Sequence, residues 1–480
     1  MPFADANSQL EPLLFQMKQY KNLTKSTIEI LPSSGQQDYA PHNKCVFTLP
    51  YASLISLEDL ALHFTFEPAG ITNTATEGLV PVRVLPPKDV ASLISEIDIK
   101  INGQTIQHLT RYNDIVNLLN MFEDPKTAKK VLQGCDVEHT SYLSSGAITN
   151  ESTFKYIENA YANTLPKEYV INNWYGLLGH RGDEVSSNFV DTNMLGEVSL
   201  TFTFAPASVC IRKDATESNL TKIKSTYKTG DLATALTETD KKLSYKLSGL
   251  KMSMVRYNLP NSYGEALSSN LSGGAKYQIA FNHYEFHSQQ APQSSGSIRW
   301  NENSRDIKGL VAFFSNADRD NINIPQVMSN DIKTSPYFKY ANPIHKDSQF
   351  QIGSVKMPQN ALNSTGCFLE LTRAVAGVRG NNIEFYHNIN TVENWTGTSF
   401  MAYLSLEMTE GMTEVANGGK KLLSGLSSEQ LPISCSYHYN NYTTGSQYSG
   451  YAWGNVNVNV MSITTRMLVI ENGQNVYVSI

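Results

Sequence analysis

Charged residues are scarce in this sequence, at 17% of 480 residues, below the roughly one quarter that is usual for globular proteins. Uncharged polar residues replace them, mainly Asn, Ser, Thr and Gln. These favour strands and ordered loops, because their side chains compete with a helix backbone for hydrogen bonds. The net charge is −6, from 38 basic and 44 acidic residues. The chain as a whole therefore offers nucleic acid no electrostatic attraction, and we expect no direct sequence-specific nucleic-acid binding.

Cysteine is rare as well. The five cysteines are far apart, odd in number and without a CxxC pair: Cys45, Cys135, Cys210, Cys367 and Cys435. This spacing argues against a disulfide framework and against a zinc site. It predicts five free, buried thiols, which is typical of a protein that folds in a reducing compartment.

Long apolar runs and catalytic motifs are missing too. No stretch approaches the roughly 18 apolar residues that a membrane span needs, and the first residues lack the basic and apolar segments of a signal peptide. The sequence has no P-loop, GxGxxG, GxSxG, HExxH or EF-hand pattern. We therefore predict no enzymatic activity, no catalytic residues and no cofactor.

The feature that dominates is alternation of apolar and polar residues with a period of two, which predicts half-buried strands. The apolar members of the clearest runs are Leu60, Leu62, Phe64 and Phe66; Ile97, Ile99 and Ile101; Val198, Leu200, Phe202 and Phe204; Leu250, Met252 and Met254; Val456, Val458 and Val460; and Val476, Val478 and Ile480. Asn102-Gly103 and Asn472-Gly473 each predict a tight hairpin, because both residues tolerate positive φ. Helical patterns are confined to residues 111–122 and 126–132.

The chain divides at a polar segment without strand pattern. The predicted regions are an N-terminal arm (1–35), a first β-rich block (36–213), a connector (214–243) and a second block (244–480). Each block is long enough for one eight-stranded barrel. Polar stretches at 136–155 and 292–348 are expected to be long loops that carry function or interfaces.

One pattern resembles a metal site. On a strand, His283, Glu285 and His287 point the same way and place three potential ligands together. No fourth ligand lies nearby, and the alternating Tyr284 and Phe286 account for a strand without a metal. We therefore predict no metal site.

Three further clusters have two interpretations each. Arg181-Gly182-Asp183 is either an adhesive tripeptide or an ordinary turn. The group Arg299, Glu302, Arg305 and Asp306 either performs acid–base chemistry or forms surface or interface ion pairs in a polar loop, and ion pairs are favoured because both signs of charge are interleaved. A late run of aromatic residues either stacks sugars or packs a subunit interface: Tyr437, Tyr439, Tyr442, Tyr448, Tyr451 and Trp453. An interface is favoured because basic residues do not surround the run.

Four segments together resemble the double jelly-roll major capsid proteins of eukaryotic DNA viruses, and those of polinton-like viruses and virophages most of all. The segments are Cys45–Pro50 with the strand that ends at Phe66; Ile97–Gln107 with the helix after it; Trp174–Leu200, closing at Ala205-Pro206; and Tyr245–Pro260, continued by Tyr277–Phe286. In the family the fourth segment looks like the entry into the second barrel.

The resemblance implies an all-β fold of two tandem eight-stranded jelly rolls with long inserted loops and few short helices. It implies a structural subunit of an icosahedral virion shell, present as a homotrimeric, pseudo-hexagonal capsomer. Its partners would be neighbouring capsomers, penton proteins and minor capsid proteins. The protein would reside in the virion, after folding and assembly in the cytoplasm or nucleus of the host cell. The alternative is a β-rich attachment protein that binds a receptor or carbohydrate.

Overall fold

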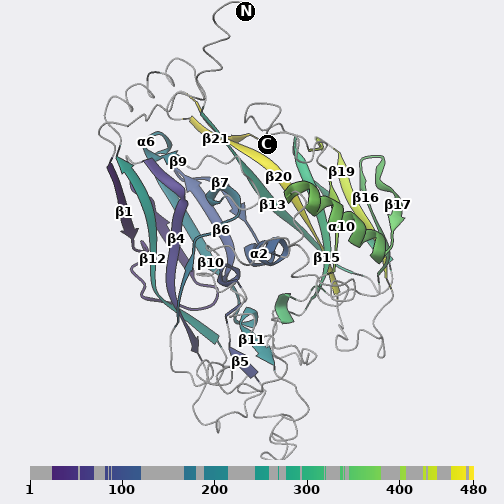
Figure 1. Cartoon of the computed structure of the whole chain (residues 1–480), viewed down its shortest axis with the longest axis horizontal. Helices are drawn as coiled ribbons and strands as arrows, with labels where there is room; N and C mark the ends of the chain where they lie inside the picture. The colour runs from purple at the N-terminus through teal and green to yellow at the C-terminus, as the bar shows by residue number, and fades with distance from the viewer. Residues whose placement is uncertain are drawn as a thin grey trace, which may run out of the picture.

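The strands form two barrels that lie side by side, with the helix α2 (Tyr112–Asn120) between them in Figure 1. A computed structural model describes residues 24–51, 54–69, 82–84, 86–87, 89–120, 167–179, 189–213, 244–258, 269, 277–291, 295–317, 319, 336–338, 340, 345–379, 400–406, 425–428, 431–439, 456–471 and 475–479. No helix in these ranges is long and apolar enough to cross a membrane.

The first barrel consists of two antiparallel sheets. Sheet 1a has the strand order β1 (Thr24–Ile30), β12 (Ser244–Asn258), β4 (Leu54–Ala69), β8 (Lys167–Ile171), with β2 (Asp38–Tyr39) on β12 and β9 (Phe189–Asp191) on β4. Sheet 1b has the order β3 (Lys44–Thr48), β10 (Val198–Phe204), β6 (Ile94–Ile101), β7 (Gln104–Leu109). A short pair, β5 (Val82–Val84) and β11 (Ile211–Lys213), stands apart.

The second barrel repeats this plan. Sheet 2a has the order β13 (Tyr277–Gln290), β20 (Val456–Glu471), β15 (Ile307–Asn316), β18 (Met401–Ser405), with β21 (Asn475–Ser479) on β20. Sheet 2b has the order β14 (Ser295–Asn301), β19 (Pro432–Tyr439), β16 (His345–Ile352), β17 (Val355–Leu362).

The two barrels have the same topology. We number the eight principal strands of each barrel in chain order. Sheets 1a and 2a then both run first, eighth, third, sixth, and sheets 1b and 2b both run second, seventh, fourth, fifth. Eight strands in two packed antiparallel sheets with this crossing order make a jelly roll. The expected pair of eight-stranded jelly rolls is confirmed.

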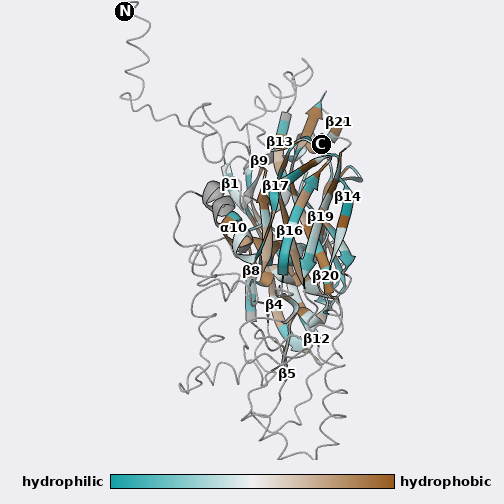
Figure 2. Cartoon of the chain, turned by 90° about the vertical axis from the view of Figure 1, so that its right-hand side faces the viewer, coloured by the Kyte–Doolittle hydropathy of each residue, from teal (hydrophilic) through white to brown (hydrophobic). Residues whose placement is uncertain are grey.

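The alternating runs bury the residues that the sequence predicted. Phe64 and Phe66 of β4 face Phe202 and Phe204 of β10 across the first core, and all four are buried. In Figure 2, hydrophilic and hydrophobic residues alternate along the strands of the second barrel that face the viewer. Among the described residues, Cys45, Cys210, Cys367 and Cys435 are buried and form no disulfide, as predicted. Cys135 lies outside the described residues.

The Asn102-Gly103 hairpin is confirmed. Ile101 pairs with Gln104, and the two turn residues have φ values of 50° and 78°, which suit Asn and Gly. β20 and β21 also pair as a hairpin, but residues 472–474 of its turn lie outside the described part. The hairpin that corresponds to β6–β7 in the second barrel is β16–β17, which turns at Gly353.

Further short helical turns are η2 (Val90–Leu93), η3 (Gly176–Leu178), α6 (Thr192–Leu195), η4 (Ala207–Val209) and η5 (Pro336–Phe338). The helix predicted near 111–122 is α2. A second helix, α10 (Ser364–Arg379), was not predicted. It follows β17 just as α2 follows β7, and the side chain of Asn363 accepts a hydrogen bond from Gly366 N at its start (2.8 Å). The helix predicted at 126–132 lies outside the described residues.

Two boundaries and one predicted loop differ from the prediction. Residues 244–258, assigned to the second block, form β12 and pair with β1 and β4 of the first barrel. Residues 24–30, assigned to the arm, form β1. The stretch 292–348, expected to be a loop, contains β14, β15 and the start of β16. The exposed positions of β14 are all polar, and β15 is buried at every described position except Lys308, so β15 shows no alternation of apolar and polar residues. The predicted connector at 214–243 lies outside the described part.

Candidate functional site

At the surface where the two barrels meet, hydrogen bonds, an ion pair and aromatic contacts join side chains of both barrels. The first barrel contributes β7, α2 and the segment around η3, and the second contributes the outer face of sheet 2a. Tyr175 packs edge-on against Tyr284 of β13, with ring centroids 6.1 Å apart. Tyr284 is only 3% exposed, so the first barrel excludes water from this face of the sheet.

Gln107 of β7 bridges the barrels by its amide group. Its Oε1 accepts a hydrogen bond from Leu177 N (2.8 Å) and its Nε2 donates one to the carbonyl oxygen of Asn282 on β13 (3.0 Å). Gln107 and Asn282 are both buried. One side chain thus satisfies a backbone donor of the first barrel and a backbone acceptor of the second, each of which would be costly to bury without a partner.

Asp114 on α2 forms a fully buried ion pair across the junction. Arg319, in the connection between β15 and β16, donates to both carboxylate oxygens, from Nη1 to Oδ1 (2.9 Å) and from Nη2 to Oδ2 (2.6 Å). Tyr340 of the same connection donates its hydroxyl to Oδ1 (2.8 Å). The Arg319 guanidinium also lies over the ring of Tyr337, 4.3 Å from its centroid.

Arg111 completes this junction network. It precedes α2 with a φ of 54° and donates from Nε to Asp114 Oδ2 (2.8 Å). Its Nη1 donates to Asn459 Oδ1 on β20 (2.6 Å), and its guanidinium lies over the rings of Phe286 and Phe313, 5.0 and 5.8 Å from their centroids. Arg111 therefore contacts both the carboxylate of Asp114 in its own barrel and aromatic rings on the outer face of sheet 2a in the other barrel.

The charges of the junction stabilise one another. Burial raises the pKa of Asp114, but the guanidinium groups of Arg319 and Arg111 outweigh it and hold that pKa far below its usual value. Burial lowers the pKa of Arg319, and Asp114 raises it above normal. Both groups are therefore ionised at every physiological pH. A bidentate, fully hydrogen-bonded pair of this kind imposes one orientation on the groups it joins.

Comparison with solved structures shows which proteins share this architecture. The PBCV-1 virus capsid has a TM-score of 0.55 and 12% identity, covering 97% of this chain and 99% of that chain. The Sputnik virophage structure has a TM-score of 0.56 and 11% identity, covering 97% and 90%. The Faustovirus major capsid protein has a TM-score of 0.54 and 8% identity, covering 95% and 92%.

The chain is a double jelly roll. These similarities extend over nearly its whole length and agree with the repeated strand order of its two barrels. At 8 to 12% identity they establish the fold. No protein-family model and no curated protein matches the sequence.

In this double jelly roll, His283, Glu285 and His287 lie on the same face of β13, as their spacing predicted. The ring of His287 stacks on Trp300 of sheet 2b, with centroids 5.2 Å apart. Burial, with Arg466 nearby, lowers the pKa of His283 to about 3, so its imidazole is neutral. Across the described residues, no three His, Cys, Asp or Glu side chains are grouped so as to hold a metal ion.

Glu302 and Asp306 were expected to form surface or interface ion pairs in a polar loop; the loop is confirmed, but neither carboxylate is exposed. Both are buried in the connection between β14 and β15. Asp306 Oδ1 accepts a hydrogen bond from Gly425 N (2.6 Å). Neither carboxylate oxygen of Glu302 has a well-formed hydrogen bond, and burial raises its pKa to about 6. Arg181-Gly182-Asp183 lies outside the described residues.

The late aromatic run is in part a core element. Tyr437 and Tyr439 of β19 are buried and pack around Phe314, so they form neither a sugar platform nor a subunit interface. The other members of the run lie outside the described residues. The alternation of β19, with Ile433, Cys435, Tyr437 and Tyr439 all inward, was a sufficient signal for this placement.

Sequence reasoning missed the junction network. Arg111 and Asp114 stand at the start of the predicted helix, where a charged pair three residues apart is an ordinary surface feature. Arg319 and Tyr340 are about 200 residues away in sequence, and nothing in the local pattern connects them to α2. Only the packing of one barrel on the other brings these groups together.

Proposed function

We propose that this double jelly roll is the major capsid protein of a DNA virus, an architectural subunit with no catalytic role. Three copies form a homotrimeric capsomer with six barrels in a pseudo-hexagonal ring, and these capsomers tile an icosahedral shell. The observation that carries the proposal is the combination of two barrels of identical strand order with a buried, ion-paired junction that fixes the angle between them.

A shell subunit needs this rigidity. A capsomer tiles a surface only if its lobes keep a constant angle, so a flexible hinge between barrels would defeat the function. The Asp114–Arg319 pair, the Gln107 bridge and the apolar contact around Tyr284 join the barrels at several separate points. The solved structures of similar fold include a PBCV-1 virus capsid and a Faustovirus major capsid protein, which supports the same role here.

The strand pairing also supports a domain division different from the sequence-based one. We place the first jelly roll at 24–258 and the second at 277–479, with residues before 24 as the N-terminal arm. The capsomer would contact neighbouring capsomers, penton proteins and minor capsid proteins. It would be a component of the virion, assembled in the cytoplasm or nucleus of the host cell.

The trimer is tested by native mass spectrometry of the purified full chain. The expected mass is about three times the 53.3 kDa of one chain, persisting on dilution because a capsomer is an obligate assembly. A protein that remains monomeric at all concentrations would contradict the capsid proposal.

A further inference from the structure

We propose that the second barrel contains a proton-driven switch, in which the guanidinium of Arg466 pairs with two carboxyl groups in turn. Arg466 pairs with the solvent-facing Glu285 while Glu302 is protonated, and it turns to Glu302 when that carboxyl ionises. The inference follows from buried polar atoms that lack hydrogen-bond partners, gathered where β13, β20 and the end of β14 come together.

The three groups come from three separate elements. Glu285 of β13 and Arg466 of β20 contact each other across the paired strands, from Oε2 to Nη2. His287, two residues after Glu285, stacks its ring on Trp300 near the end of β14, with centroids 5.2 Å apart. Glu302 follows Trp300 by two residues and is only 6% exposed. The stacking therefore brings the buried carboxyl of Glu302 close to Glu285 and Arg466, which both act on it electrostatically.

Buried polar atoms without a partner point to the second pairing. Both carboxylate oxygens of Glu302, Nε of Arg466 and Nε1 of Trp300 are buried and make no hydrogen bond within the described part of the chain. A buried carboxylate without partners is too costly to be ionised, so the described arrangement is that of protonated Glu302. A turn of Arg466 towards Glu302 would give partners to atoms of both side chains.

The pair that Arg466 forms with Glu285 is weak. Its Nη2 lies 3.5 Å from Glu285 Oε2, at the outer limit of a hydrogen bond. The side chain of Glu285 is 43% exposed, so water competes with Arg466 for its carboxylate. A guanidinium has five N–H donors and keeps its charge in proteins. Arg466 can therefore leave one carboxylate for another at little cost.

The charge on Glu302 decides which pair forms. When Glu302 is protonated it carries no charge, and Arg466 is attracted to Glu285. When Glu302 is ionised, its buried carboxylate attracts the guanidinium more strongly than a solvated one does, because the effective dielectric constant is lower there. The three groups together are neutral in the first state and carry one net negative charge in the second. That charge lies on Glu285, so the surface at β13 becomes more acidic as the pH rises.

Arg466 is the cation that acts on Glu302, whose pKa burial raises to about 6, and the histidines nearby do not replace it. Burial lowers the pKa of His283 to about 3, with contributions from Arg466 and from His108 of β7, so His283 stays neutral where Glu302 titrates. Burial also lowers the pKa of His287. The other charged groups on these elements are Asp306, which accepts a hydrogen bond from Gly425 N (2.6 Å), and the exposed Arg299 and Arg305.

Crystal structures of the purified full chain at pH 5 and pH 8 test the switch directly. At pH 5 Arg466 should contact Glu285, and at pH 8 its guanidinium should lie about 3 Å from the carboxylate of Glu302. In the variant Glu302→Gln, whose side chain cannot ionise, Arg466 should stay with Glu285 at both pH values. A wild-type chain in which Arg466 has the same partner at both pH values would overturn the proposal.

Thermal unfolding provides a second test. Arg466→Gln should lower the unfolding temperature at least about twofold more at pH 8 than at pH 5, because only at the higher pH does it leave an ionised Glu302 buried without a partner. Equal losses at the two pH values, or a pH difference that persists when Arg466→Gln is combined with Glu302→Gln, would contradict the switch.

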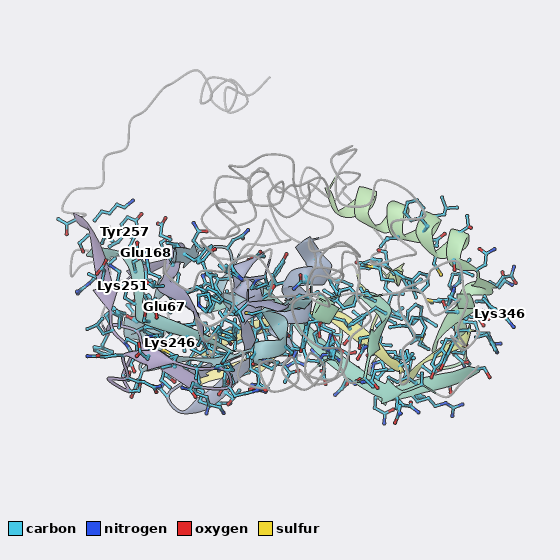
Figure 3. All side chains as sticks on the ribbon, turned by 90° about the horizontal axis from the view of Figure 1, so that it is seen from below. Glu67, Glu168, Lys246, Lys251, Tyr257 and Lys346 are labelled. Carbon is cyan, nitrogen blue, oxygen red and sulfur yellow. The ribbon has the colours of Figure 1, made fainter. Side chains whose placement is uncertain are left out.

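The control for Arg466→Gln is Lys246→Gln on sheet 1a. It breaks an exposed ion pair with Glu67 (3.0 Å), and Figure 3 shows both residues at the end of the molecule away from the second barrel. No buried carboxyl group competes for this lysine among the described residues that it pairs with. Lys246→Gln should therefore have the same small effect on the unfolding temperature at pH 5 and pH 8.

Discussion

Asp114 shows how much of the chain's geometry depends on one side chain. It is fully buried, and its carboxylate accepts hydrogen bonds from three side chains: Arg319 and Tyr340 of the second barrel, and Arg111 directly before its own helix. We expect Asp114→Asn to lower the free energy of unfolding by about 3 to 5 kcal/mol, because Arg319 is left as a buried charge without its partner. Chemical denaturation measures this.

Asp347→Asn is the control for Asp114→Asn. Asp347 pairs with His438 at 2.6 Å on an exposed face, and removing an exposed pair should cost no more than about 1 kcal/mol. Equal effects of the two substitutions would show that the buried pair does not hold the junction together.

The buried carboxyl of Glu302 predicts that the free energy of unfolding depends on pH. Burial raises its pKa from 4.5 to about 6, so the folded chain favours the protonated carboxyl. Below pH 4.5 the carboxyl is protonated in both the folded and the unfolded chain, and its burial has no charge penalty. As the pH rises through 6, the folded chain must hold a buried carboxylate, and the free energy of unfolding falls by about 2 kcal/mol. Glu302→Gln should therefore stabilise the chain above pH 7 and have no effect near pH 4.5, as seen in urea unfolding at the two pH values. A variant that is less stable than wild type at pH 8 would contradict this account.

At the scale of elements, the bridge from β7 to β13 gives a further prediction. Gln107→Met keeps the side-chain volume but leaves Leu177 N and the carbonyl oxygen of Asn282 buried without a partner. We expect a loss of about 2 kcal/mol in the free energy of unfolding. Gln104→Met, on the exposed start of the same strand, is the control and should change stability by less than about 0.5 kcal/mol.

The elements also show what a sequence alone can predict. The strands β4, β6, β10, β12 and β20 could be predicted because period-two alternation is a direct consequence of one buried face. The barrel to which β12 belongs could not be predicted, because β12 pairs with strands far away in sequence: its nearest partner in β4, Ala69 opposite Ser244, is 175 residues away, and β1 is farther still. The helix α10 was missed because Thr365, Gly366 and Thr372 weaken its helical pattern, although the Asn363 cap was a usable signal.

The candidate site was less predictable than the fold. The alignment of His283, Glu285 and His287 on one face could be read from their spacing, since strand geometry alone decides it. The junction network could not, because it joins α2 to a connection in the other barrel, and only tertiary packing determines which surfaces of two similar barrels meet.

At the scale of the whole molecule, the two barrels share one continuous apolar core that includes side chains of both, such as Tyr175 and Tyr284. We therefore expect the chain to unfold in a single transition, followed in parallel by tryptophan fluorescence and circular dichroism. Two separated transitions would mean that the barrels are independent units with a loose junction.

The central claim is that three copies of this chain assemble into one capsomer with six barrels in a pseudo-hexagonal ring. Electron microscopy of the purified full-length protein tests it most directly. The predicted class averages show a compact particle with six lobes of similar size and a pseudo-hexagonal outline, in which three identical chains contribute two lobes each. Averages that show two-lobed monomers, or elongated fibres, would contradict the claim.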